Sequence, residues 1–244
     1  MVDSSGLCLP RLEAHRNLTE TVYEALKSAI VENRLPSGHR LTEVAVASTF
    51  GVSTTPVREA LTRLEREGLV SLIPRRGAVV RSFAAEDILG IYEIREMLEA
   101  TATVKAIARR SPSLVEQLGD IVARCGPVVA ALDQRGFNRL DVEFHRLIMQ
   151  ACGNPHLLRL YERLHDQFQM IRLRAVFLPG RPETPHAEHQ QFLAAFAAGD
   201  ANAAEQLIRW HIQHTALDLV SALSGEEPAQ TPLRFAMLEG GSDR

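Results

Sequence analysis

Two features of exported and membrane proteins are missing from this sequence. It contains no apolar run of about 18 residues or more, so no membrane-spanning helix is predicted. Residues 1–16 lack the apolar core of a signal peptide. The three cysteines, Cys8, Cys125 and Cys152, are far apart and form no Cys-x-x-Cys pair, which argues against a disulfide framework and a zinc ribbon. We therefore expect a cytoplasmic protein in a reducing compartment.

A strong charge of either sign is also absent. The 244 residues carry a net charge of −3, which by itself argues weakly against nucleic-acid binding. Residues 1–82 contain 11 Arg and Lys against 9 Asp and Glu, whereas the remainder contains 16 against 21. The N-terminal third is therefore the basic part. With 45% hydrophobic and 23% charged residues, the composition is that of a globular protein with room for two modest domains or one large one.

Apolar residues repeat with helical spacing along most of the chain. Before residue 68 the pattern predicts three helices, at 19–32, 42–50 and 53–67. Residues 69–73 and 78–81 are β-prone runs on either side of a turn at 74–77, so they predict a hairpin, the only strand pair expected. Further helices are predicted at 85–109, 113–134, 138–151, 156–177, 185–198 and 200–223.

The chain divides near residues 82–86 on this interpretation. Three helices and a hairpin, in that order, predict a winged helix-turn-helix at 19–82. The short connections that follow favour an antiparallel all-helical bundle at 86–223. The fold class is therefore mainly α, with one β-hairpin. Residues 1–18 are expected to be flexible, and the tail at 224–244 to be disordered.

The predicted third helix has the features of a DNA-reading helix. Gly51-Val52 supplies the tight turn before it. Thr54, Thr55 and Arg58 share one face near its N-terminus, where hydroxyls and the helix dipole suit phosphate and an Arg can bond guanine bidentately. Arg75 and Arg76 lie at the predicted hairpin tip, where a wing meets the DNA backbone or minor groove. The alternative is an ordinary solvated helix surface.

Several runs in this region resemble the GntR family of bacterial transcription regulators. They are Arg34-Leu-Pro-Ser-Gly-His-Arg-Leu41, Gly51-Val-Ser-Thr-Thr-Pro-Val-Arg-Glu-Ala-Leu61, Leu64-Glu-Arg-Glu-Gly-Leu-Val70 and Pro74-Arg-Arg-Gly77. The resemblance implies that the DNA-binding residues are Thr54, Thr55, Arg58, Arg75, Arg76 and Gly77. Thr54 and Val44 stand where the family usually has arginines, so we expect an operator sequence or affinity that departs from the family norm.

Polar groups at inward-facing positions suggest a metal site in the predicted bundle. Asp141 and His145 are four residues apart on an apolar helix face, and His189 and His211 lie on the inward sides of later helices. One carboxylate and three imidazoles would suit a first-row transition metal. The alternative is a set of hydrogen-bonded core residues, and His186 and His214 are also candidates because each lies one turn away from a proposed ligand.

The helical region also resembles the FadR subfamily, whose C-terminal effector domain is of the FCD type. The resemblance rests on Asp141-Val-Glu-Phe-His145-Arg-Leu, Gly153-Asn154, Glu188-His189, Ala198-Gly-Asp200 and His211. It implies a divalent metal, zinc or nickel, bound by Asp141, His145, His189 and His211. Arg95 matches a frequently charged family position, and either an effector contact or a surface ion pair would explain it; Arg172 and Arg174 are similarly ambiguous.

Together these features predict a homodimeric transcription regulator, with repression favoured, that binds a palindromic double-stranded DNA operator. A small organic acid bound at the metal would control it. Two alternatives stay open: a metal-dependent enzyme fused to a DNA-binding module, and a sensor of the metal itself. No general base, nucleophile motif or Gly-rich phosphate loop stands out, so we expect no catalytic activity.

Overall fold

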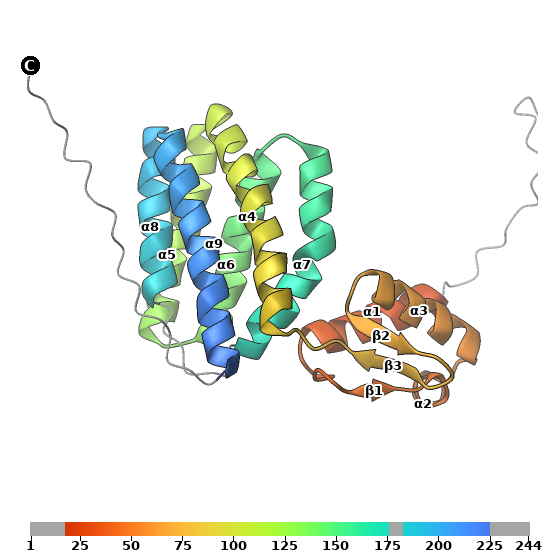
Figure 1. The fold of residues 1–244 in the computed structure, drawn as a ribbon. Coiled ribbons are helices and arrows are strands. Elements are labelled where there is room, and N and C mark those ends of the chain that lie inside the picture. The colour runs from red at the N-terminus through yellow and green to blue at the C-terminus, as the bar shows by residue number, and fades with distance from the viewer. Residues whose placement is uncertain (1–17, 176–182, 225–244) are drawn as a thin grey trace, which may run out of the picture. The chain divides into compact units, whose positions relative to one another are not determined.

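The computed structural model describes residues 18–175 and 183–224, which form two compact units divided after residue 82 (Figure 1). All but one residue of each predicted flexible end, 1–18 and 224–244, lies outside the described residues. The two exceptions are helical, because Leu18 begins the first helix and Ser224 ends the last. None of the helices in the described ranges is long and apolar enough to cross a membrane.

The first unit is a winged helix-turn-helix. Its elements are α1 (Leu18–Val31), β1 (Arg40–Leu41), α2 (Glu43–Phe50), α3 (Thr54–Arg66), β2 (Val70–Ile73) and β3 (Gly77–Val80). The strands form an antiparallel sheet in the order β1-β3-β2. The prediction of a single hairpin was therefore incomplete. A two-residue strand such as β1 is too short to show the alternation by which strands are detected.

Local capping fixes both ends of α2, including the turn into α3. The Thr42 side chain caps α2 by accepting a 3.2 Å hydrogen bond from the Ala45 amide. At the other end, Gly51 adopts a left-handed φ of 65° and its amide bonds the carbonyls of the last turn. Because Leu61 and Leu64 of α3 are fully buried, the opposite side of this helix faces outward.

The second unit is an antiparallel helical bundle (Figure 1). Its helices are α4 (Ala85–Ala108), α5 (Pro112–Ala130), α6 (Gln134–Ala151), α7 (Pro155–Ala175), α8 (Glu183–Ala198) and α9 (Ala201–Ser224). α4 packs against α6, α7 and α9, while α8 packs against α5 and α9. The predicted fold class, a winged helix-turn-helix followed by an all-helical bundle, is confirmed.

Two adjacent helix boundaries in the bundle were predicted wrongly. The helix predicted at 113–134 ends at Ala130, and the next begins at Gln134 rather than at 138. The reason is the side chain of Asp133, which accepts a 2.8 Å hydrogen bond from the Gly136 amide and so caps a new helix. Gly136, expected to separate two helices, lies in the first turn of α6. The end of the helix predicted at 156–177, and the break predicted at 179–182, fall outside the described residues.

Candidate metal centre and DNA-binding surface

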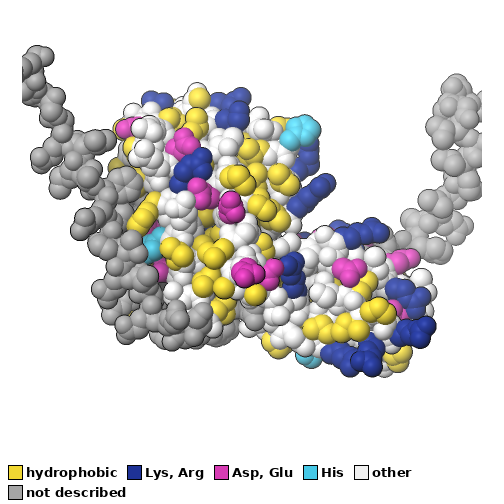
Figure 2. Space-filling model, viewed as in Figure 1, with side chains coloured by type: hydrophobic (Ala, Val, Ile, Leu, Met, Phe, Trp, Pro, Cys, Tyr) yellow, Lys and Arg dark blue, Asp and Glu magenta, His cyan; other side chains and the backbone are white. Residues whose placement is uncertain are grey.

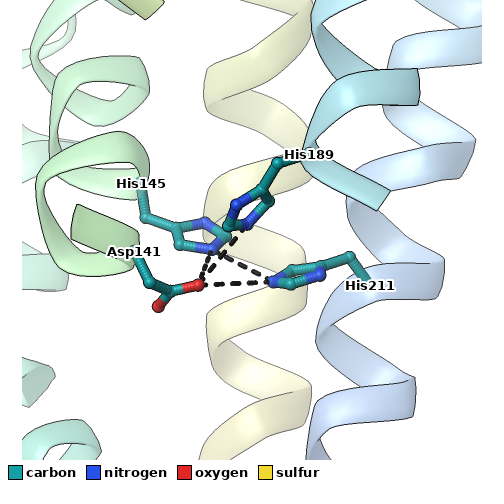
Figure 3. Close-up of side chains that lie close together, drawn as sticks. All are labelled: Asp141, His145, His189 and His211. Atoms are coloured by element: carbon teal, nitrogen blue, oxygen red, sulfur yellow. Dashed lines mark hydrogen bonds and ion pairs between the residues drawn. The ribbon is translucent and has the colours of Figure 1, made fainter. Parts of the chain in front are cut away.

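Three helices bring four potential metal ligands together in the bundle interior (Figure 3). Asp141 and His145 project from successive turns of α6, His189 comes from α8, and His211 from α9. All four side chains are buried, with exposures of 5% or less. We call them the four-ligand cluster. His186 and His214, the alternatives that the sequence offered, are not part of it.

The spacing of the ligand atoms suits a single metal ion. Asp141 Oδ1 lies 3.4 Å from His145 Nε2, 3.4 Å from His189 Nε2 and 3.9 Å from His211 Nε2. The Nε2 atoms of His145 and His211 are 3.2 Å apart. A tetrahedral zinc site with bonds of about 2.0–2.1 Å has ligand atoms roughly 3.3 Å apart. The donor set and its dimensions therefore fit a small divalent ion.

Two of the imidazoles contact buried carboxylates through Nδ1, the ring nitrogen that is not directed at the other ligands. Glu99 Oε2 lies 2.5 Å from His145 Nδ1, and Glu188 Oε2 lies 2.7 Å from His211 Nδ1. A neutral imidazole that donates its Nδ1 proton to a carboxylate keeps the Nε2 lone pair for a metal. Hydrogen bonds from His211 and His214 outweigh the effect of burial and lower the pKa of Glu188 to about 2. Arg95 and His145 likewise outweigh the effect of burial and lower the pKa of Glu99, so both carboxylates are ionised acceptors.

Sequence reasoning assigned no role to either carboxylate. Glu188 immediately precedes a ligand in the chain and belongs to the run Glu188-His189 quoted above, whereas Glu99 lies one helical turn after Arg95 in a stretch that drew no attention. Glu188 also accepts a hydrogen bond from His214 Nδ1 at 2.9 Å, and the His214 ring stacks on Trp210 with centroids 5.5 Å apart. The polar network thus reaches from the four-ligand cluster to the single tryptophan of the chain.

His189 is the ligand whose polar atoms most need a partner. Its ring nitrogens are buried, and neither has a hydrogen-bond partner among the described residues. The ring stacks on Phe144, with centroids 4.2 Å apart. Burial, together with the neighbouring His211 and His145, holds the pKa of His189 well below its ordinary value. The imidazole is therefore neutral, and a metal ion would satisfy the otherwise unpaired Nε2.

Two buried arginines, Arg172 and Arg95, lie near the cluster, and Arg172 contacts it directly. Arg172 Nη1 donates to Asp141 Oδ2, which leaves Oδ1 facing the imidazoles. Burial and the nearby charge of Arg95 lower the pKa of Arg172 to about 10. The side chain of Arg174, also considered from the sequence, is not among those described.

Arg95 lies in the interior rather than on the surface. Its Nε donates to Glu99 Oε1 at 2.6 Å, and its guanidinium carbon lies 5.3 Å from the centroid of the Tyr92 ring. Neither Nη1 nor Nη2 has a hydrogen-bond partner among the described residues. The Tyr161 hydroxyl lies close enough to Arg95 for the two groups to interact electrostatically. Buried donors without acceptors are costly, so this edge of Arg95 suits an anion.

The predicted DNA-binding residues lie on the first unit, where Lys and Arg side chains are exposed (Figure 2). On α3, Thr54 is half-buried while Thr55 and Arg58 are exposed. Arg75 and Arg76 are exposed in the turn between β2 and β3. Gly77 adopts a φ of 88°, and any Cβ there would collide with the backbone of Leu41 on β1. Gly77 therefore shapes the wing rather than presenting a side chain.

The comparisons with known proteins agree with this architecture. Residues 18–80 match the gntR family of bacterial regulatory proteins, and residues 90–214 match the FCD domain. The transcriptional repressor GlaR of Escherichia coli strain K12 is 30% identical over 203 residues, covering 78% of this chain and 90% of GlaR. The transcriptional regulator YdhC of Bacillus subtilis strain 168 is 30% identical over 196 residues, covering 79% of this chain and 86% of YdhC.

A solved structure supports the fold independently. E. coli McbR/YncC superposes with a TM-score of 0.69 at 23% identity, covering 83% of this chain and 96% of that one. The resemblances stated from the sequence are thereby confirmed. The chain belongs to the GntR family of bacterial DNA-binding transcription regulators, in the FadR-type group whose C-terminal domain is an FCD domain.

Proposed function

We propose that this protein is a cytoplasmic, homodimeric repressor whose binding to a palindromic operator is controlled by a small carboxylate held at a metal ion in the FCD domain. The observation that carries the proposal is the buried four-ligand cluster in a chain that also has a winged helix-turn-helix. The families and relatives are transcription regulators, so we infer a binding protein without catalytic activity.

Zinc or nickel is the metal that we propose. The four-ligand cluster offers three neutral nitrogens and one carboxylate oxygen, a set that suits both ions. When bound, the ion would act as a Lewis-acid anchor for an anionic ligand. Glu99 and Glu188 would keep His145 and His211 oriented with Nε2 toward the ion.

The charges around the cluster favour an anionic effector. Arg95, Arg172 and a divalent ion would face Asp141, Glu99 and Glu188, which leaves one positive charge in excess if the histidines are neutral. A small carboxylate would compensate this charge. It would also give acceptors to Nη1 and Nη2 of Arg95, which we therefore propose as an effector-binding residue.

A second copy of the chain would explain an apolar face on α4. Ile94, Met97 and Val104 are 39%, 52% and 38% exposed, and Figure 2 shows hydrophobic side chains on the surface over this helix. With Gly90, Thr101 and Ala108 they repeat at alternating spacings of four and three residues, the pattern of a helix-pairing seam. A two-fold dimer would present two copies of α3 to the two halves of a palindrome.

Control of DNA binding requires differential affinity. The carboxylate must bind more tightly to the DNA-free arrangement of the dimer than to the DNA-bound one. Because α4 carries both Arg95 and the exposed apolar face, it is the element through which we expect this preference to act.

The test is elemental analysis of protein purified without a tag or chelator, beside the double variant Asp141→Ala/His145→Ala. We expect about one divalent ion per chain in the wild type and none in the variant. Operator binding is then measured with metal alone and with metal plus small carboxylates. An operator response to metal alone would favour the direct sensor, turnover of the acid would favour the enzyme, and no metal after reloading would refute the proposed site.

A further inference from the structure

An acidic residue lies beside the DNA-reading face, where a negative charge would repel phosphate. Glu43 is the first residue of α2, and Arg58 lies in the second turn of α3. Arg58 Nε donates to Glu43 Oε1 at 3.0 Å and to Oε2 at 3.1 Å, while Arg58 Nη2 donates to Oε2 at 2.7 Å. This is a two-point contact between a planar guanidinium and a carboxylate.

The contact uses only one edge of the guanidinium. Glu43 occupies the side formed by Nε and Nη2, and Nη1 makes no hydrogen bond to any described residue. The end of the guanidinium formed by Nη1 and the outer hydrogen of Nη2 is therefore still available. Two parallel donors at this end match the O6 and N7 acceptors of guanine in the major groove.

Glu43 is better fixed than its partner. It lies in the first turn of α2, where the helix dipole favours an anion, beside the capping residue Thr42. The exposed fraction of its side chain is 28%, against 66% for Arg58. The hydrogen bond from Arg58 lowers the pKa of Glu43, so the carboxylate is ionised at neutral pH. A long, exposed arginine is thus tied to a short, anchored carboxylate.

We propose that Glu43 is a specificity-determining residue, which positions Arg58 so that its free end reads a guanine instead of pairing with phosphate. This inference rests on the proposed use of α3 in the major groove. Glu43 would lower the affinity for DNA in general through its charge and raise the affinity for one base through Arg58. Specific and non-specific binding should therefore respond to its removal in opposite directions.

The test uses Glu43→Gln in the full-length protein. An operator is first selected in vitro with the wild type, and binding to it is compared with binding to a scrambled duplex at matched salt. We expect a loss of about ten-fold or more on the operator, and unchanged or tighter binding to the scrambled duplex. Replacing the Arg58-dependent guanine by 7-deazaguanine should weaken the wild type but leave Glu43→Gln unaffected.

A matched control is Glu20→Gln. Glu20 on α1 pairs at 2.7 Å with Arg63, which lies on α3 like Arg58. The control variant should alter neither binding constant. Tighter binding of Glu43→Gln to the operator would overturn the proposal by showing that Glu43 competes with DNA for Arg58. An equal loss on both duplexes would overturn it in favour of a structural role. Failure of the wild type to select any sequence would instead refute the proposed function.

Discussion

Replacing Glu99 with Gln should weaken metal binding by about 10- to 100-fold, which corresponds to about 1.4–2.8 kcal/mol. The reason lies in the two hydrogen bonds that Glu99 accepts, from Arg95 Nε at 2.6 Å and from His145 Nδ1 at 2.5 Å. The two bonds reach different oxygens of Glu99, and an amide replaces one of these oxygens with an NH₂ group that only donates. If the oxygen stays with Arg95, the Nδ1 proton of His145 faces another donor. The imidazole must then rotate or move its proton to Nε2, where the metal binds.

The measurement is a competition titration with Zn²⁺ or Ni²⁺ against a chelating dye. Glu96→Gln is the matched control, because Glu96 lies on the same helix but bonds Arg209 and Gln213 on α9 instead. Wild-type affinity in a folded Glu99→Gln protein would refute the reasoning. Loss of one partner of a buried ion pair costs about 3–5 kcal/mol of folding free energy, so this variant could unfold. Glu188→Gln then tests the same principle at His211, with the same expected loss.

Three further results are expected. Arg58→Ala should weaken operator binding ten-fold or more, by about 1–3 kcal/mol, and unchanged affinity in a titration at matched salt would contradict the DNA contact. Met97→Glu should convert the dimer to monomer in light scattering, whereas persistence of the dimer would place the interface elsewhere. Burial lowers the pKa of His211 from 6.5 to about 4, so the unfolded chain binds more protons between these values. The metal-free protein should therefore lose stability as pH falls from 6.5 toward 4, and denaturant titrations of His211→Asn should show a flatter dependence there.

Sequence reasoning predicted the members of the four-ligand cluster correctly, and their binding of a metal stays a prediction. Asp141 and His145 lie four residues apart on a strongly amphipathic helix, and both residue types are uncommon in an apolar core. The inward positions of His189 and His211 made them candidates, and the family resemblance then favoured them over the other histidines of the chain. That four side chains from three helices meet within 4.8 Å is a fact of tertiary packing.

The supporting residues could not be predicted for a physical reason. The roles proposed for Glu99, Glu188 and Glu43 rest on contacts with residues 46, 23 and 15 positions away. A single glutamate on a helix has no local pattern that separates it from a solvated surface residue. The same limit applies to Arg95, whose burial depends on Tyr92 and Phe168 closing over it. Local rules did not anticipate β1 either, because its pairing with β3 joins residues far apart in sequence.

The position of Trp210 gives the protein an intrinsic optical probe. It is the only tryptophan in the chain, it precedes a proposed metal ligand, and its ring stacks on His214, which bonds the same carboxylate as His211. Its emission therefore comes from one place and responds to the protonation and orientation of the stacked imidazole. The proposed binding of metal or acid to the FCD domain should therefore change the fluorescence of the unlabelled protein. The same signal, recorded with operator present, would report on the coupling between the two domains.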